Sequence, residues 1–314
     1  MEHRNIGKSG LRVSVVGLGC NNFGGRIDLD ATRKVVHKAL DLGITFFDTS
    51  DTYGDPRGSS ESCLGRILGD RRQHIVLASK FARPMDAAGR LRGASRRYII
   101  AEVEASLRRL KTDWIDLYQQ HQPDPLTPIE ETLRALDDLV RQGKVRYIGC
   151  STLPTWQVVE AQWTARHLGL HHFISCQEEY SLLARDLDRD MMPALQSYGL
   201  GLIPFRPLAD GLLTGKYRRG APPPPGTRLA TTARAAQRDL TEKNWTIIER
   251  LEGFATEHGH TLLELALSWL AQRPAVASII AGATSPEQVE QNVRAIGWPL
   301  TEEEMREIDR LTAR

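Results

Sequence analysis

Short apolar segments alternate with longer amphipathic ones along nearly the whole chain, and this alternation constrains the fold more than any other feature. Eight of the short segments are rich in aliphatic and β-branched residues and have the length of strands. They are Val13–Gly19, Ile44–Asp48, Ile75–Lys80, Ile115–His121, Val145–Ser151, Phe173–Gln177, Leu200–Phe205 and Ala277–Gly282. Strands this uniformly apolar are buried on both faces, so the pattern predicts an α/β fold with a parallel sheet covered by helices. Eight strands can close a barrel, and an open doubly wound sheet is the competing architecture.

Several of the intervening segments begin with helix start signals. Asp30 and Ser95 are placed as N-caps, and Pro128 suits the first turn of a helix. Gly43 follows the first of these helices as a stop signal. The predicted helices cover Ala31–Leu42, Arg96–Leu110, the segment from Pro128 to Gln142, Thr261–Leu270 and Pro286–Ala295.

Length and composition fit one barrel domain over residues 1–314. Hydrophobic residues make up 41% and charged residues 25%, which is usual for globular proteins. The net charge of +2 gives no reason to expect a nucleic-acid partner. No apolar run is long enough for a membrane span or a leader peptide, so we expect a cytoplasmic protein without a membrane partner. The four cysteines lack metal-ligand spacing and are expected to be reduced, and nothing indicates the oligomeric state.

Two segments depart from the regular alternation. Arg4–Val15, with a Lys-Ser-Gly turn, predicts a β-hairpin ahead of the first barrel strand. Arg206–Arg238, after the seventh strand, is unusually long for a loop and has seven basic residues against Asp210 alone. It is either a solvated basic loop or a binding lid. Because phosphate sites recur at this end of α/β barrels, we expect a ligand with a phosphate group.

The segment Val16-Gly-Leu-Gly-Cys-Asn-Asn22 resembles a dinucleotide fingerprint only superficially. The third glycine of that motif would fall at position 22, which is asparagine, and no convincing helix begins there. The segment therefore does not predict a Rossmann fold.

Three successive strands end in polar residues that suit acid–base chemistry. Asp48 ends the second strand and is followed by Tyr53, Lys80 ends the third strand and His121 the fourth. The carboxyl ends of barrel strands meet at one rim, so these side chains are expected to converge. A buried Asp48–Lys80 pair would place an ammonium beside Tyr53 and is expected to lower the pKa of the phenol. Such a phenol can protonate a carbonyl oxygen while His121 donates a second hydrogen bond, and these residue types do not form a usual metal site.

These residues lie within longer motifs that resemble the aldo-keto reductase superfamily. The motifs are Asp48-Thr-Ser-Asp-Thr-Tyr-Gly54, Ser79-Lys80, Asp116-Leu-Tyr-Gln-Gln-His-Gln-Pro-Asp124 and Gly143-Lys-Val-Arg-Tyr-Ile-Gly-Cys-Ser151. The resemblance runs from the hairpin to the last helix. The long segment Arg206–Arg238, called the lid below, resembles the longer lid of the bacterial-type branch of this superfamily. It implies a (β/α)₈ barrel that reduces an aldehyde or ketone reversibly with hydride from a nicotinamide. It also implies Tyr53 as the proton donor, with Asp48, Lys80 and His121 completing the catalytic set.

The resemblance further implies a set of cofactor-binding residues. These are Ser151, Thr152, Gln177, Phe205, Arg206, Leu208, Gly211, Lys216, Arg228, Gly282, Thr284, Gln288 and Asn292. Thr152 stands where the family usually has asparagine, and Arg206 where it usually has serine. Gly282 and Gln288 stand where many members bind the adenosine 2′-phosphate with lysine and arginine. The resemblance nevertheless implies NADP as the cofactor. Thr284, the helix start near Pro286 and a lid arginine such as Arg228 are expected to replace those contacts, and NAD stays possible.

The sequence leaves one alternative function and the substrate open. Some barrels of this family act as non-catalytic, nucleotide-sensing partners of ion channels, whereas the complete catalytic set favours an enzyme. A small carbonyl or alcohol is the expected substrate. Candidate pocket residues are Phe23, Arg26, Phe81, Arg83 and Trp114, of which the two arginines would favour a polar or anionic substrate.

Overall fold

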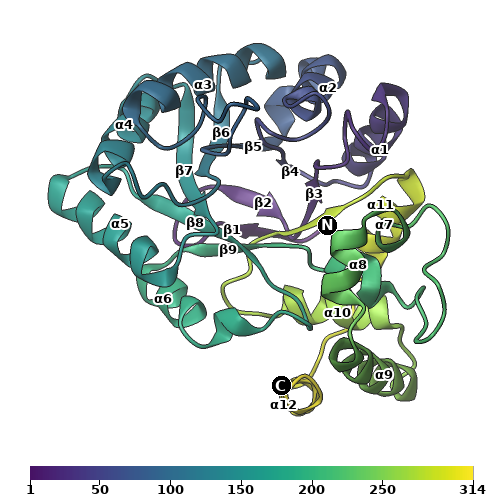
Figure 1. Cartoon of the computed structure of the whole chain (residues 1–314). Coiled ribbons are helices and arrows are strands. Elements are labelled where there is room, and N and C mark those ends of the chain that lie inside the picture. The colour runs from purple at the N-terminus through teal and green to yellow at the C-terminus, as the bar shows by residue number, and fades with distance from the viewer. Residues whose placement is uncertain (314) are drawn as a thin grey trace.

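The computed structural model describes residues 1–313 and is built around one eight-stranded parallel sheet. The strands follow the order β10-β3-β4-β5-β6-β7-β8-β9. Hydrogen bonds between Leu202 and Ala275 and between Ala277 and Leu202 join β9 to the segment before β10, so the sheet nearly closes on itself. Figure 1 looks into this ring of strands, with helices on its outside. The fold is a (β/α)₈ barrel, as the alternation in the sequence predicts.

The barrel strands agree with the eight predicted segments to within a few residues. The largest difference is at the start of the first strand, because Val13 belongs to the hairpin and β3 begins only at Val16. The barrel strands are β3 Val16–Gly19, β4 Phe46–Asp48, β5 Val76–Phe81, β6 Ile115–Gln120, β7 Val145–Ser151, β8 Phe173–Glu179, β9 Gly201–Phe205 and β10 Ile279–Gly282.

The predicted helices are present, and several more complete the outer layer. The helices are α1 Leu29–Asp41, α2 Ser59–Ile67, α3 Arg96–Leu110, α4 Ile129–Arg141, α5 Thr155–Leu168, α6 Met191–Tyr198, α7 Arg228–Thr231, α8 Ala233–Asp239, α9 Glu242–Glu257, α10 Leu262–Ala271, α11 Pro286–Arg294 and α12 Glu302–Leu311. Ser95 caps α3 as expected. Asp28, rather than Asp30, caps α1 by accepting a hydrogen bond from the Ala31 amide. Pro128 occupies the N-cap of α4 instead of its first turn.

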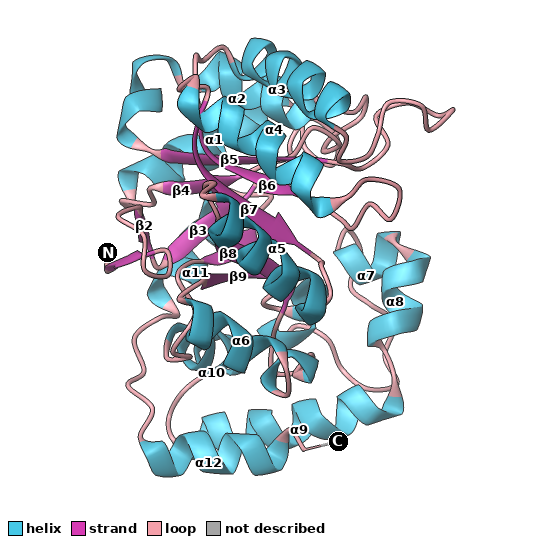
Figure 2. Cartoon of the chain, turned by 90° about the vertical axis from the view of Figure 1, so that its left-hand side faces the viewer, coloured by secondary structure: helices cyan, strands magenta, loops and turns pink. Residues whose placement is uncertain are grey.

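The predicted hairpin closes one end of the barrel. It consists of β1 His3–Asn5 and β2 Arg12–Ser14, paired antiparallel. Ile6 and Val13 from the hairpin are fully buried and join the apolar cluster inside the barrel. Figure 2 shows the hairpin end of the barrel on the left and helices α7 and α8 on the right.

The interior of the barrel changes from apolar to polar along its axis. Side chains two residues apart on a strand point to the same face. Phe46, Ala78 and Leu117 form an apolar layer. Two residues further along the same strands stand Asp48, Lys80 and Gln119, which form buried polar contacts with one another. The alternation thus brings polar side chains together at the carboxyl ends of the strands, opposite the hairpin.

The glycine-rich first strand has a packing role. A Cβ atom at Gly17 would lie 2.7 Å from Ser278 Oγ and 2.9 Å from the Phe46 ring. These distances are too short for a real carbon contact, so the barrel interior requires glycine there. The resemblance of this segment to a nucleotide-binding motif therefore has a packing explanation.

Candidate active site

A cavity of about 890 Å³ opens at the carboxyl ends of the barrel strands. Residues in or after all eight barrel strands contribute to its wall, and the segment after β9 forms one side. Among the predicted catalytic residues, Asp48, Tyr53 and His121 line the cavity, and Lys80 lies directly behind Tyr53. The structure therefore brings all four together, as their positions at strand ends predict.

Lys80 connects the buried acid to the tyrosine. Its side chain is fully buried, and its Nζ atom lies 2.6 Å from Asp48 Oδ2 and donates to the Thr49 carbonyl oxygen at 2.9 Å. The third neighbour of the ammonium is the Tyr53 hydroxyl at 3.3 Å. The second oxygen of Asp48, Oδ1, accepts hydrogen bonds from the side-chain amides of Gln119 and Gln177, at 3.1 and 2.8 Å. Every polar atom of this buried pair thus has a partner, which such a pair needs in order to be tolerated.

The electrostatics of the tyrosine differ from the expectation. Burial raises the pKa of Tyr53, and Lys80 opposes this rise without reversing it. The expected net lowering is therefore wrong, because desolvation of the phenolate outweighs the attraction of the ammonium. Burial also lowers the pKa of Lys80, but the contacts with Asp48 and Tyr53 outweigh burial and leave it raised. At neutral pH the site therefore holds a neutral phenol beside a charged lysine.

His121 lies edge-on to Tyr53, with ring centroids 5.7 Å apart. Its Nδ1 atom lies 3.1 Å from Ser50 Oγ. Burial, Lys80 and Arg83 lower the pKa of His121 well below its usual value. The imidazole is therefore neutral at physiological pH and can present one N–H and one lone pair.

All thirteen predicted cofactor-binding residues contribute to the wall of this same cavity. Ser151, Thr152 and Gln177 lie in or just after β7 and β8. Gln177 contacts Asp48 and Thr152 contacts His121, so these three residues form the inner end of the cavity. Phe205 ends β9 and is partly exposed to the cavity. The remaining predicted residues come from the lid and from the segment around α11.

The backbone is strained where the strands run into this rim. Five residues other than glycine have positive φ angles just after β5, β7 and β9, namely Ala82, Thr152, Arg206, Ala209 and Asp210. Such angles are unfavourable for residues with a Cβ atom, especially for β-branched threonine. Strain of this kind persists where the surrounding structure fixes the backbone, and it concentrates at functional sites.

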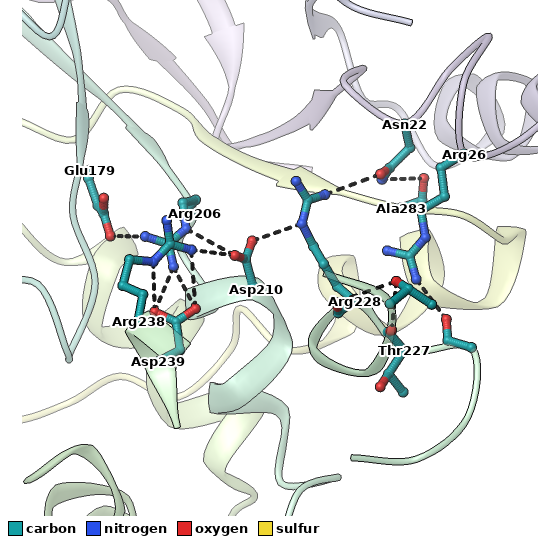
Figure 3. A network of polar contacts seen from close by, with 12 residues as sticks. Asn22, Arg26, Glu179, Arg206, Asp210, Thr227, Arg228, Arg238, Asp239 and Ala283 are labelled. Atoms are coloured by element: carbon teal, nitrogen blue, oxygen red, sulfur yellow. Dashed lines mark hydrogen bonds and ion pairs between the residues drawn. The ribbon is translucent and has the colours of Figure 1, made fainter. Parts of the chain in front are cut away.

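The lid is more ordered and less positively charged than the sequence indicates. Instead of a loop, it contains a 3₁₀ segment, Ala209–Thr214, and the two helices α7 and α8. Arg206 pairs with Glu179, Asp210 and Asp239, as Figure 3 shows. Acidic residues on neighbouring elements therefore neutralise positive charge of the lid, which a count of the residues within Arg206–Arg238 does not reveal.

Most of the other lid cations are also paired. Arg238 pairs with Asp210 and Asp239, and Arg218 and Arg219 pair with glutamates on α9. Lys216 lines the cavity and has no acidic partner among residues 1–313, and burial lowers its pKa. Of the lid cations, Lys216 is therefore the one that best fits an incoming phosphate.

Two arginines join the lid to the rest of the rim. Arg228 lies 3.2 Å from Asp210 and donates to Asn22 at 3.4 Å (Figure 3). Arg26, in the loop after β3, donates to the Gly226 carbonyl oxygen at 2.7 Å. The lid is thus held against the loop after β3, across the mouth of the cavity.

The outer end of the cavity lies at the start of α11. Ser285 caps this helix, and Pro286 occupies its first turn. The Gln288 side chain accepts hydrogen bonds from the Thr284 amide at 2.8 Å and hydroxyl at 3.2 Å. Helix N-termini attract phosphate groups through their free amides and dipole. A phosphate here could interact with this helix start and with Arg228.

Sequence reasoning missed several residues of the site. Gln119 supports Asp48, and Ser50 contacts His121, although neither is a residue type that signals catalysis by itself. Alternation with Leu117 could have placed Gln119 inside the barrel. Of the candidate pocket residues, Arg26 and Arg83 line the cavity. Phe23, Phe81 and Trp114 do not, because both phenylalanines are core residues and Trp114 packs against Arg72 and Arg146.

The donors around the cavity fit a nicotinamide nucleotide. Its wall combines the hydroxyl and amide groups of Ser151, Thr152 and Gln177 with Lys216, Arg228 and the start of α11. Gly211 has a φ of +93°, and a Cβ atom there would lie 2.9 Å from Lys216 Nζ. Glycine at position 211 therefore leaves space next to the Lys216 ammonium. Among residues 1–313, no cluster of His, Cys, Asp or Glu is suited to a metal ion, and no helix is long and apolar enough to cross a membrane.

Comparisons with known proteins agree with this geometry. The chain is 36% identical to L-glyceraldehyde 3-phosphate reductase of Escherichia coli K12, over 94% of this chain and 88% of the relative. It is 37% identical to the uncharacterized oxidoreductase YrpG of Bacillus subtilis, over 98% and 94% of the two chains. A probable voltage-gated potassium channel subunit beta of Arabidopsis thaliana is 36% identical, over 94% and 91%. The sequence profile of the Aldo/keto reductase family matches residues 15–313. With its barrel and its rim of Asp48, Tyr53, Lys80 and His121, this chain belongs to the aldo/keto reductase family of oxidoreductases.

Proposed function

We propose that the protein is a carbonyl reductase that uses NADP(H), with Tyr53 as the proton donor. The observation that carries this proposal is the contact of the Tyr53 hydroxyl with Lys80 Nζ at 3.3 Å, on the wall of a cavity large enough for substrate and nucleotide. A neutral phenol beside a buried ammonium can release its proton to an oxygen that gains negative charge. The nucleotide, when bound, would supply the hydride.

Each residue has a defined part in this proposal. Tyr53 gives its proton to the carbonyl oxygen, and the Lys80 ammonium stabilises the phenolate that remains. Asp48 keeps Lys80 charged and in place, as the 2.6 Å contact and the raised pKa of Lys80 support. His121, neutral and beside the tyrosine, orients the carbonyl by donating a hydrogen bond. The reverse sequence would oxidise an alcohol.

We favour NADP(H) over NAD(H) because of the outer end of the cavity. Lys216, Arg228 and the first turn of α11 would together hold the pyrophosphate and the 2′-phosphate. Ser151, Thr152 and Gln177 would hold the nicotinamide carboxamide, and Phe205 would lie against its ring. We expect this cytoplasmic enzyme to act on small carbonyl compounds, without a nucleic-acid or membrane partner.

A second candidate function is nucleotide sensing without turnover. It is favoured by the relatives whose names describe potassium channel beta subunits. The complete set of Asp48, Tyr53, Lys80 and His121 favours the enzyme.

Single-turnover kinetics test the proposal. The protein is loaded with NADPH and mixed with a panel of aldehydes and ketones while nucleotide absorbance is followed. We expect oxidation by at least one carbonyl, and a rate about 10²- to 10⁴-fold lower in Tyr53→Phe with unchanged NADPH binding. Tight NADPH binding without oxidation by any carbonyl would support the sensing function. Full activity of Tyr53→Phe would refute the assigned proton donor.

A further inference from the structure

Behind His121 lies a buried group of three carboxylic acids that the proposed reaction does not use. Asp51 follows β4, Glu61 lies on α2 and Glu102 on α3. Asp51 and Glu61 are fully buried, and Glu102 is nearly so. Arg109 is the one cation that forms ion pairs with members of this group in residues 1–313. If all three acids were ionised, the group would have a net charge of −2.

The contacts of Arg109 show which acid lacks a charged partner. Arg109 Nε lies 2.6 Å from Glu61 Oε2, and its Nη2 lies 2.5 Å from Glu102 Oε1. Glu61 also accepts a hydrogen bond from Ser79 Oγ at 2.5 Å. Within residues 1–313, Asp51 forms no ion pair, and its buried Oδ2 atom has no hydrogen-bond partner.

The environment of Asp51 therefore favours its neutral form. Burying an unpaired carboxylate is very unfavourable, and such a group binds a proton instead. Burial, together with the charges of Glu61 and Glu102, raises the pKa of Asp51 well above its usual value, although Ser50 and Arg109 oppose this rise. The tyrosines whose pKa values respond to this group, Tyr98 and Tyr118, are neutral and bring no positive charge.

A hydrogen-bonded chain connects this acid to the catalytic histidine. Ser50 Oγ lies 2.8 Å from Asp51 Oδ1 and 3.1 Å from His121 Nδ1. It also accepts a hydrogen bond from the Thr52 amide at 3.3 Å. Thr52 Oγ1 lies 3.1 Å from the same oxygen, and either hydroxyl can donate in that contact. The single proton of Ser50 can go to only one neighbour at a time, so Ser50 cannot donate to both Asp51 and His121.

The protonation state of Asp51 determines the direction of this chain. An ionised Asp51 would take the proton of Ser50, so His121 would donate from Nδ1 and its Nε2 atom would have no proton. A neutral Asp51 donates to Ser50, which then donates to His121 Nδ1, so that the imidazole proton is on Nε2. The Nδ1 atom is turned toward Ser50, so Nε2 is the ring nitrogen left for a ligand in the cavity, and only the second arrangement lets it donate to a carbonyl oxygen.

We propose that Asp51 is a neutral acid that, through Ser50, holds the proton of His121 on Nε2 and so prepares it to donate to the substrate carbonyl. Asp51 and Ser50 are thus positioning residues, because they act through His121. The role of the donated hydrogen bond depends on the proposed reductase function, whereas the protonation pattern does not. Burial, with the charges of Lys80 and Arg83, keeps the ring of His121 neutral.

Nitrogen NMR of the full-length protein with ¹⁵N-labelled histidine tests the pattern directly. The two ring nitrogens of neutral histidine have distinct shifts according to which has the proton, and His121→Asn identifies the signals of His121. At pH 7 we expect a protonated Nε2 and an unprotonated Nδ1. A protonated Nδ1 would overturn the proposal, and this result would not depend on any substrate being found.

Two further measurements test the chain of hydrogen bonds. The infrared difference between wild type and Asp51→Asn at pH 7 should contain the carbonyl band of a protonated carboxylic acid, and its absence would overturn the proposal. In Ser50→Ala we expect the single protonation pattern of His121 to be lost and kcat to fall about tenfold, the order of one general-acid hydrogen bond. The matched control is Ser268→Ala, which replaces a buried serine on α10 outside the cavity. It should change neither the protonation pattern of His121 nor kcat. An unchanged His121 pattern in Ser50→Ala would overturn the relay.

Discussion

Replacing Lys80 by methionine should destabilise the protein strongly, because it leaves a buried charge without its partner. The Lys80 side chain is fully buried and that of Asp48 is 2% exposed. Without the ammonium, Asp48 keeps only the amides of Gln119 and Gln177. Removing one member of a buried ion pair typically costs about 3–5 kcal/mol, whereas replacing both members can be nearly neutral. We therefore expect Lys80→Met to lower the free energy of unfolding by about 3–5 kcal/mol.

The double variant Asp48→Asn/Lys80→Met separates charge from packing. It removes both charges, so we expect it to be more stable than Lys80→Met, although neither variant should retain reductase activity. Urea unfolding at pH 7, followed by tryptophan fluorescence, gives the free energies of wild type, both single variants and the double variant. A coupling energy of about 3 kcal/mol would agree with the geometry. A loss below about 1 kcal/mol in Lys80→Met, or single effects that simply add, would refute the reasoning.

Three further predictions concern the pocket and a buried acid. Arg83 lines the cavity without an acidic partner in residues 1–313. Arg83→Met should therefore raise KM about tenfold for an aldehyde with a phosphate or carboxylate group, and should change KM little for a neutral aldehyde. Equal effects on both substrates would contradict this prediction. Arg228→Ala should weaken the binding of NADPH about tenfold in calorimetric titrations, and the binding of NADH much less. An equal loss of affinity for both nucleotides would argue against a 2′-phosphate contact. Burial raises the pKa of Glu178 to about 7, so the folded protein keeps a proton that the unfolded chain releases, and stability falls as the pH rises from about 4.5 to about 7. Glu178→Gln should remove up to about 3 kcal/mol of the stability difference between pH 4 and pH 8 in urea unfolding, and an unaltered difference would count against this cause.

The sequence by itself determines the barrel and the position of the rim where Asp48, Tyr53, Lys80 and His121 meet. Strand segments are local and uniformly apolar, and their number and alternation with helices leave few arrangements. Asp48, Lys80 and His121 lie at or just after the ends of successive parallel strands, so their convergence follows from chain order alone. Helix limits are predicted less well, since Asp28 and Asp30 have equal capping ability and only backbone geometry selects between them.

Only the tertiary structure decides the electrostatics of the site. The lid appears strongly basic when its residues are counted in sequence, but Glu179 and the glutamates of α9 come from elsewhere and neutralise much of it. Likewise, the pKa of Tyr53 depends on how deeply the phenol is buried, which Lys80 alone does not reveal. Strand patterns are set by neighbours along the chain, whereas desolvation and ion pairing depend on groups brought together from distant segments. That is why the sequence predicts which residues meet at the rim, and the folded structure decides where their charges and protons reside.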